Sequence, residues 1–293
     1  MPCHALISTE LDPYWNLAAE AQLLSKIEPS SSPLLFFWRS RPAVIIGKNQ
    51  NPWRECNLDW MARQNVCLAR RISGGGAVYH DLGNLNYAVF LPRETYDTDQ
   101  VFERTVKALR HLGIPATRVD RTSLYVEGYK ISGHAFCMRK HAVLHHGTLL
   151  VDADIESLRQ ALRPSEEWRI ETKATASVRA RVKNLSSCRT GVSIQEIQES
   201  LMRAWQCSAP ADQIGDGWGG EQLSESRSEF ASPEWLFDRT PDFCLSHHTA
   251  TSGLDADIRF QVRKGHVVEQ QGDIAAHPDW TGVRLPPFGE LFG

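Results

Sequence analysis

The sequence has few of the features that mark membrane, disulfide-rich or zinc-binding proteins. Its apolar runs, such as Leu34–Trp38 and Ala43–Ile46, are far shorter than the roughly 18 residues that a membrane helix needs. Its seven cysteines form no CxxC pair, which argues against a disulfide framework and a zinc ribbon and favours a reducing compartment. We therefore expect neither a membrane span nor a structural metal.

A strong overall charge is also lacking. The net charge of −3 gives the chain no general attraction to nucleic acid or anionic lipid. The charge is nevertheless uneven, because residues 39–71 carry seven Lys or Arg against two Asp or Glu, and residues 161–190 carry seven against three. Two basic faces suggest an acidic partner or a phosphate-bearing ligand, although ordinary solvated faces would give the same counts.

Length and composition predict an ordinary globular protein with more than one unit. A chain of 293 residues that is 42% hydrophobic and 23% charged can form one large domain and a smaller one. Strand-like and helix-like segments alternate without a regular βαβ rhythm, which predicts a mixed α/β (α+β) fold. We place a large domain at 1–206, a linker or mobile loop rich in Gly, Ser, Asp and Glu at 207–233, and a smaller C-terminal unit at 234–293.

Local patterns predict several elements. Asp12 and Pro13 are the expected N-cap and first residue of an opening helix, and Ser193 begins a capping box that starts a late helix. The runs Leu34–Trp38 and Ala43–Ile46, parted by a polar turn, predict two strands paired with each other. The other predicted elements are strands at 66–70, 84–91, 123–126 and 147–152, a helix across 101–112, and a hairpin across 257–269.

Three consecutive glycines form the most informative stretch. Gly74, Gly75 and Gly76 remove every Cβ between two predicted strands, so a ligand can lie directly against main-chain N–H groups. Arg71, just ahead of them, offers a planar and permanently charged fork for an anion. The spacing is neither that of a P-loop nor that of the GxGxxG fingerprint. A glycine hairpin that binds nothing is the alternative, and the charged residues on both sides of the loop make it the weaker one.

A lysine between glycines is the second candidate. Lys130 lies between Gly128 and Gly133 at the end of a predicted strand, where a backbone can approach closely. In the pocket of the glycine loop its ammonium could hold a carboxylate oxygen and a phosphate oxygen together. At about 4 Å and an effective dielectric near 20, each contact is worth roughly 4 kcal/mol before desolvation. A solvated lysine is the alternative, so we predict specifically that Lys130 shares a cavity with the glycines.

Two adjacent histidines are the third candidate. His145 and His146 point to opposite faces of an ideal strand, so they cannot both ligate one metal. The spacing of Cys137, His141 and His145 could suggest a metal, but no second cluster supports it. We expect one histidine, His146, to line the pocket and no metal to be bound.

Together these motifs resemble the lipoate–protein ligase A family, which includes the mitochondrial lipoyltransferases. The similar segments follow the family order through most of the chain and lie at 12–20, 45–57, 70–84, 130–133, 145–150, 177–185 and 234–243.

The resemblance implies a biotin/lipoate-ligase-like mixed-sheet catalytic domain at 1–206 and a small, truncated C-terminal accessory domain at 234–293. The implied chemistry has two steps. Lipoate and ATP with Mg²⁺ give lipoyl-AMP, and a lysine of an acceptor protein then attacks the acyl carbon and releases AMP. Lys130 would be the catalytic residue, because its ammonium can neutralise charge that builds on the carbonyl oxygen. The implied cofactor-binding residues are Arg71, Gly74, Gly75, Gly76, Ala77, Val78, Tyr79 and His146.

The sequence departs from the family pattern at three places. Ser123 stands where the family usually has aspartate, His134 stands where a small residue is usual, and the C-terminal unit is short. Two alternatives therefore stay open: ATP-independent transfer of lipoyl or octanoyl groups between carrier proteins, and a non-catalytic lipoyl-carrier-binding protein. A cysteine thioester would serve the former, and Cys137 is the candidate for it.

The resemblance also implies partners and a compartment. The expected acceptors are lipoyl-domain proteins, namely 2-oxoacid dehydrogenase E2 subunits and the glycine cleavage H protein. We expect no nucleic acid or membrane partner and a monomeric enzyme. A mitochondrial location is expected if the source is eukaryotic, although the N-terminus lacks an Arg-rich presequence, and a cytoplasmic one otherwise.

Overall fold

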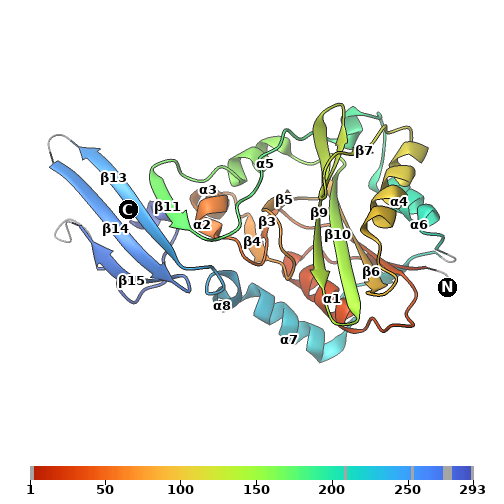
Figure 1. The fold of residues 1–293 in the computed structure, drawn as a ribbon, viewed down its shortest axis with the longest axis horizontal. Helices are drawn as coiled ribbons and strands as arrows, with labels where there is room; N and C mark the ends of the chain where they lie inside the picture. The colour runs from red at the N-terminus through yellow and green to blue at the C-terminus, as the bar shows by residue number, and fades with distance from the viewer. Residues whose placement is uncertain (1–2, 208–209, 252–253, 273–278, 292–293) are drawn as a thin grey trace.

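Three β-sheets follow one another along the longest axis of the protein (Figure 1). The computed structural model describes residues 3–207, 210–251, 254–272 and 279–291. The largest sheet has eight strands in the order β12-β1-β2-β6-β10-β9-β8-β7 and mixes parallel with antiparallel pairs. Its strands are β1 His4–Ser8, β2 Leu34–Trp38, β6 Asn84–Pro92, β7 Thr117–Arg118, β8 Ser123–Val126, β9 Tyr129–Met138, β10 Ala142–Leu150 and β12 Asp212–Ile214.

The two smaller sheets have three and four strands. The three-stranded sheet has the order β4-β3-β5, with β3 Ala43–Ile46, β4 Cys67–Arg70 and β5 Val78–His80. The four-stranded sheet is antiparallel and has the order β11-β13-β14-β15, with β11 Trp168–Thr172, β13 Phe243–Thr251, β14 Leu254–Arg263 and β15 His266–Gln271.

The helices lie on both faces of the large sheet and between the sheets (Figure 1). None of those in the described segments is both long and apolar enough to span a bilayer. They are α1 Pro13–Ser25, α2 Pro52–Glu55, α3 Leu58–Arg63, α4 Thr98–His111, α5 Ile155–Ala161, α6 Ile194–Ala204, α7 Gly220–Ala231, α8 Pro233–Leu236 and α9 Phe288–Leu291, with a short 3₁₀ turn at Leu185–Ser187.

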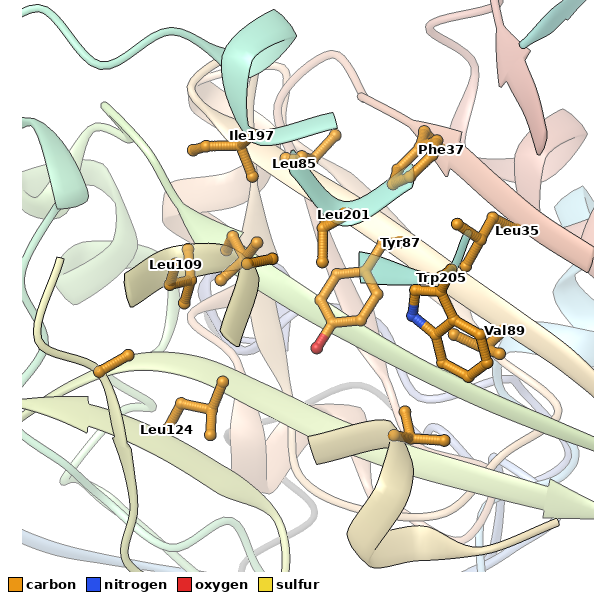
Figure 2. Close-up of a cluster of buried hydrophobic side chains, with 14 of the residues drawn as sticks. Leu35, Phe37, Leu85, Tyr87, Val89, Leu109, Leu124, Ile197, Leu201 and Trp205 are labelled. Atoms are coloured by element: carbon orange, nitrogen blue, oxygen red, sulfur yellow. The ribbon is translucent and has the colours of Figure 1, made fainter. Parts of the chain in front are cut away.

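Alternating side chains divide the core into two layers. Phe36 faces α1 and α7, whereas its neighbour Phe37 faces α4 and α6, because successive strand residues point to opposite faces. Figure 2 shows the second layer, where Tyr87 lies among aliphatic side chains from the sheet and from α6. The mixed α/β fold predicted from the sequence is confirmed, and so are the Asp12 N-cap of α1 and the Ser193 capping box of α6.

Two predictions about the chain's path are wrong. The runs β2 and β3 do not pair with each other: β2 lies between β1 and β6, and β3 lies between β4 and β5. Each is a central strand with nearly every residue buried, so the turn between them carries the chain from one sheet to the next. The segment 207–233 is not simply a loop, because it contains β12 and the helix α7, which packs along α1 through Leu223 and Phe230.

The C-terminal sheet takes one strand from the earlier part of the chain. Strand β11 pairs with β13, and Trp53 of α2 packs in the same cluster as Phe243 and Phe260. The indole of Trp53 also donates to the carbonyl of Pro286. The boundaries 1–206 and 234–293 stay predictions, but the two regions share a sheet and an apolar cluster. Residues 252–253, 273–278 and 292–293 of the predicted C-terminal unit lie outside the described ones.

A buried histidine pair lies in the second core layer. The His134 and His145 rings are joined through Nδ1 and Nε2 at 2.8 Å, and Ser132 and Tyr87 contact His134 Nε2. The Phe102 ring lies 4.2 Å from that of His134. Burial lowers the pKa of both histidines, that of His145 to about 3, so both are neutral in the folded protein.

Acidification is therefore expected to destabilise the protein. In the unfolded chain both histidines would bind protons near pH 6.5, so below that pH the unfolded state binds more protons than the folded state. The free energy of unfolding should fall by up to about 1.4 kcal/mol per pH unit for each histidine. Urea unfolding measured at neutral pH and in stepwise more acidic buffers gives the slope. His145→Phe should reduce it, and an unchanged slope in that variant would contradict the assignment.

Candidate functional site

The glycine loop connects β4 to β5 and packs on the end of β3. A Cβ on Gly47, just after β3, would lie 2.3 Å from the carbonyl oxygen of Gly75, so only glycine permits this contact. Gly75 has a φ of +88°, a left-handed conformation that glycine adopts without strain. A Cβ there would also lie 2.9 Å from the Arg71 guanidinium. The glycines therefore allow the loop to pack closely against the Arg71 side chain and against the backbone of Gly47.

That side chain, Arg71, supports the loop from within. Its guanidinium donates to the carbonyls of Gly74 and Gly76 at 2.6 and 2.8 Å, to Ile45 O and to Ser73 Oγ. Burial lowers its pKa to about 10, which leaves it charged at neutral pH. Four protein oxygens thus occupy most of the fork that the sequence suggested would hold an anion.

A series of hydrogen bonds continues from Arg71 through buried side chains of the site. Ser73 Oγ accepts from Arg71, so its single proton is free for His146 Nε2, 2.7 Å away. His146 Nδ1 then donates to Glu20 at 2.8 Å, and the Trp38 indole donates to the other oxygen of that carboxylate. The chain links the glycine loop to β10, to β2 and to α1. Both ring nitrogens of His146 are used in this way.

Lys130 reaches the same place from β9. Its side chain folds over Gly133, where an added Cβ would lie 3.5 Å from the ammonium nitrogen. Burial lowers its pKa and the Asp120 carboxylate partly offsets this, but within the described residues no ion pair or hydrogen bond to the ammonium is present. A charge held in a cavity without a directly paired carboxylate is suited to an anionic ligand.

One cavity of about 320 Å³ brings these groups together. Its apolar walls include Leu17, Trp38, Ile45 and Val78. Of the residues predicted from sequence, it is lined by Arg71, Gly75, Gly76, Ala77, Val78, Lys130 and His146. The prediction that Lys130 shares a cavity with the glycine loop is thereby confirmed.

A second cavity of about 690 Å³ adjoins the first. Both are lined by Ala77, Val78 and Lys130, so Lys130 belongs to their common wall. The second cavity also contains Tyr79 and the arginines Arg54, Arg159, Arg163 and Arg179. Tyr79 therefore lies only in the second cavity, and Gly74 lines neither.

The segment 173–183 runs between the two cavities and is hydrogen-bonded to the glycine loop. Ser177 Oγ accepts from the amide of Ala77 at 2.9 Å and from the Gln50 side chain at 3.0 Å. Gln50 in turn accepts from the Gly47 amide, and the Ser177 amide donates to Glu55. These contacts are the main part of the site that the sequence did not reveal.

Sequence reasoning also missed that the buried Glu20 carboxylate is part of the site. Glu20 was noted only as the end of a motif, yet it is a carboxylate in the middle of the buried side of α1, among Leu17, Leu23 and Leu24. An acidic residue at such a position is unusual unless it is paired, and that signal could have found it. The described residues contain no group of three or more His, Cys, Asp or Glu side chains placed to hold a metal ion.

Comparison with known proteins gives a consistent result. A family model described as the lipoyl protein ligase A/B catalytic domain matches residues 12–206. A relative, the lipoate-protein ligase A of Psychrobacter cryohalolentis, is 36% identical over 283 residues, covering 92% of this chain and 82% of the relative.

Solved structures agree with these matches. P. falciparum LipL1 in complex with lipoate has a TM-score of 0.72 at 27% identity and covers 92% of this chain and 84% of its own. A lipoate-protein ligase A bound with ATP has a TM-score of 0.67 at 29% identity, covering 80% and 98%. A bipartite ligase of Thermoplasma acidophilum, described with its E2 lipoyl domain, has a TM-score of 0.68 at 28% identity, covering 80% and 96%.

Two substitutions test whether the Arg71 guanidinium is held by the protein while the Lys130 ammonium is not. Arg71→Lys cannot satisfy the loop carbonyls and should lower the free energy of unfolding by about 3 kcal/mol. Lys130→Met removes a half-buried charge that makes no ion pair among the described residues and should raise the free energy of unfolding by about 1 kcal/mol. Urea unfolding of both variants near neutral pH gives the comparison. A loss of stability in Lys130→Met would show that the ammonium has a structural partner.

Proposed function

The chain belongs to the lipoyl protein ligase A/B catalytic-domain family and is a lipoate–protein ligase, and we propose that it acts through lipoyl-AMP. In the first step the lipoate carboxylate attacks the α-phosphate of ATP and pyrophosphate leaves. In the second step the amine of an acceptor lysine attacks the acyl carbon and AMP leaves. The observation that carries this proposal is the position of Lys130 on the wall common to two cavities.

The two cavities suit the two halves of an acyl-adenylate. The smaller one has apolar walls of Leu17, Trp38, Ile45 and Val78, which fit an aliphatic chain with a compact ring at its end. The larger one is lined by Arg54, Arg159 and Arg163, whose guanidinium groups suit phosphate oxygens. Lipoate in one structural neighbour and ATP in another support the same pair of substrates.

Lys130 serves both steps in the same way. Its ammonium can neutralise the lipoate carboxylate and the α-phosphate as they approach each other. During acyl transfer it can also stabilise the negative charge on the carbonyl oxygen, together with amides of the glycine loop. A contact at about 4 Å with an effective dielectric near 20 contributes roughly 4 kcal/mol before desolvation. Because its pKa is lowered only by burial, the bound anions would raise it again and keep the lysine charged.

Magnesium is proposed to enter with ATP. Mg²⁺ usually keeps several waters and is held by substrate phosphates with one or two carboxylates. The described residues offer no cluster of acidic ligands, so no protein ligands are assigned to it and no step depends on it.

The thioester alternative finds little support in the geometry. Cys137 lines neither cavity, and burial raises the pKa of its thiol, which lowers its reactivity. Transfer between carriers without ATP would therefore have to proceed without this cysteine. Transfer from a lipoylated donor in the absence of nucleotide would identify that activity directly.

Lipoyl domains are the proposed acceptors. The structural neighbour described with its E2 lipoyl domain supports this class. E2 subunits of 2-oxoacid dehydrogenases and the glycine cleavage H protein remain the specific candidates. The monomeric state and a mitochondrial or cytoplasmic location stay predictions from the sequence.

ATP–pyrophosphate exchange that depends on lipoate tests the first step. Lys130→Ala should reduce the exchange rate at least about a hundredfold, because it removes the charge that both substrates share. Lys183→Ala is the matched control, since Lys183 is a nearby lysine paired at the surface with Glu127, and it should stay near the wild-type rate. An equal loss of exchange rate in both variants would show that Lys130 has no special role in the first step. No exchange in the folded wild-type protein, with transfer from lipoyl-AMP intact, would confine the enzyme to the second step.

Charge reversal tests the acceptor surface. Arg179, which also lines the second cavity, and Arg181 are both exposed, and lipoyl domains are expected to be acidic. The double variant Arg179→Glu, Arg181→Glu should raise KM for the acceptor about tenfold at low salt, with a smaller effect on KM for ATP. Arg203→Glu, an exposed reversal on α6, is the control and should change neither constant. Equal loss of acceptor and nucleotide binding would indicate misfolding instead.

A further inference from the structure

Two of the seven cysteines are neighbours across a β-bridge. Cys3, directly before β1, pairs in parallel with Cys207, which lies just after α6. Both side chains pack in the core layer that α4 and α6 cover. All seven cysteines lie in the described segments, and no other two of them are partners in a sheet or bridge. About 200 residues separate the two along the chain, so no sequence motif reveals the pair.

Backbone hydrogen bonds hold both cysteines in place. Gln206 has a left-handed backbone with a φ of +57°, which turns the chain back at the end of α6. The amide of Cys207 can therefore donate to Met202 O at 3.0 Å, the hydrogen bond that characterises a Schellman helix ending. On the other side of the bridge, the amide of His4 donates to Pro33 O at 3.0 Å and fixes the start of β1.

The separation of the two residues suits a disulfide. Neighbouring strands lie about 4.7–4.9 Å apart, and the Cα atoms of a disulfide usually lie about 4.4–6.8 Å apart. The thiols of Cys3 and Cys207 are already hydrogen-bonded to each other. Little backbone movement is therefore needed to join the two sulfur atoms.

The two thiols differ in reactivity. Cys3 is 3% exposed, and its hydrogen bond to Cys207, together with burial, raises its pKa, while the nearby charge of Arg104 offsets a part of this. Its Sγ also lies 3.3 Å from His4 O, a second acceptor for its proton. Cys207 is half-buried, and the same hydrogen bond lowers its pKa, because the Cys3 thiol stabilises the Cys207 thiolate as a donor. Cys207 is therefore the nucleophile of the pair.

We propose that Cys3 and Cys207 form a reversible disulfide by exchange with a small-molecule disulfide of the glutathione type. The Cys207 thiolate attacks one sulfur of the small disulfide, forms a mixed disulfide and releases a thiolate. Cys3 then loses its proton and attacks the Cys207 sulfur, which closes the protein disulfide and releases the second thiolate. Each released thiolate takes up a proton, so two protein thiols are oxidised and one small disulfide is reduced to two thiols. A reducing compartment keeps the pair open, and an oxidising one closes it.

The disulfide joins two segments that support α1. Strand β1 leads into α1, and the chain after Cys207 leads through β12 into α7, which packs along α1. It also closes a loop of about 200 residues, which restricts the unfolded chain and so favours the folded one. Neither Cys3 nor Cys207 lines the cavities of the candidate site, so the disulfide changes stability and leaves substrate binding unchanged. The inference does not rest on the proposed function.

Oxidised glutathione, mixed in stepwise ratios with reduced glutathione, is the probe for the folded full chain. After alkylation of the remaining thiols, peptide mapping by mass spectrometry should find Cys3 linked to Cys207. The midpoint of thermal unfolding should lie about 5–10 °C higher in the linked protein than in the reduced protein. Dithiothreitol should reverse both the link and the shift.

Single variants test the roles of the two thiols. In Cys3→Ala the mixed disulfide of Cys207 with glutathione should accumulate, because the second attacking thiol is missing. In Cys207→Ser the buried Cys3 should stay unmodified, and neither variant should show the rise in the midpoint. Cys67→Ser is the matched control, since it removes a cysteine of similar exposure, and it should behave as the wild type does.

Three results would overturn the inference. The first is the absence of a link between Cys3 and Cys207 in the folded wild-type protein at the most oxidising ratio. The second is a link that forms only in urea, and the third is a linked protein that unfolds at the same temperature as the reduced one.

Discussion

The site depends on a single buried guanidinium that holds the glycine loop in shape. A loop with three successive glycines loses much conformational freedom on ordering, so its fixed form needs compensating contacts. Arg71 provides them through Gly74 O, Gly76 O and Ser73 Oγ, and Ser73 extends the chain to His146 and Glu20. Since these groups come from the loop, from β10 and from α1, one network fixes the walls of the acyl cavity relative to one another.

The neighbouring arginine joins the same loop region to the C-terminal part of the protein. Arg70 is fully buried and donates to the carbonyls of Gly47, Lys48 and Gln50 on one side and to Leu236 O and Thr240 Oγ1 on the other. Successive residues of a strand point to opposite sides, so Arg70 and Arg71 serve different regions from adjacent positions. On another path, β11 pairs with β13 and leads into the segment that Ser177 fastens to the glycine loop. Two separate sets of contacts, one through Arg70 and one through β11 and Ser177, therefore connect the C-terminal sheet to the cavities.

The sequence predicted what depends on local pattern and missed what depends on tertiary pairing. Caps at Asp12 and Ser193 mark α1 and α6 because the signal lies within a few residues. The run Ala43–Ile46 was recognised as a strand, but its partners β4 and β5 are set by the packing of a separate sheet. The same limit applies to the site. Residue types placed Lys130 and the glycines together, whereas only the geometry reveals that Arg71 is turned toward carbonyls.

Polar groups in the cavity are of two kinds. Some are hydrogen-bonded by the protein and hold the cavity in shape, and others are free to bind a ligand. Arg71, His146 and Glu20 are satisfied by the protein, so they contribute to stability whether or not substrate is present. Within the described residues the Lys130 ammonium and the His80 ring make no hydrogen bond to the protein, so these groups gain hydrogen bonds only when a ligand or water reaches them.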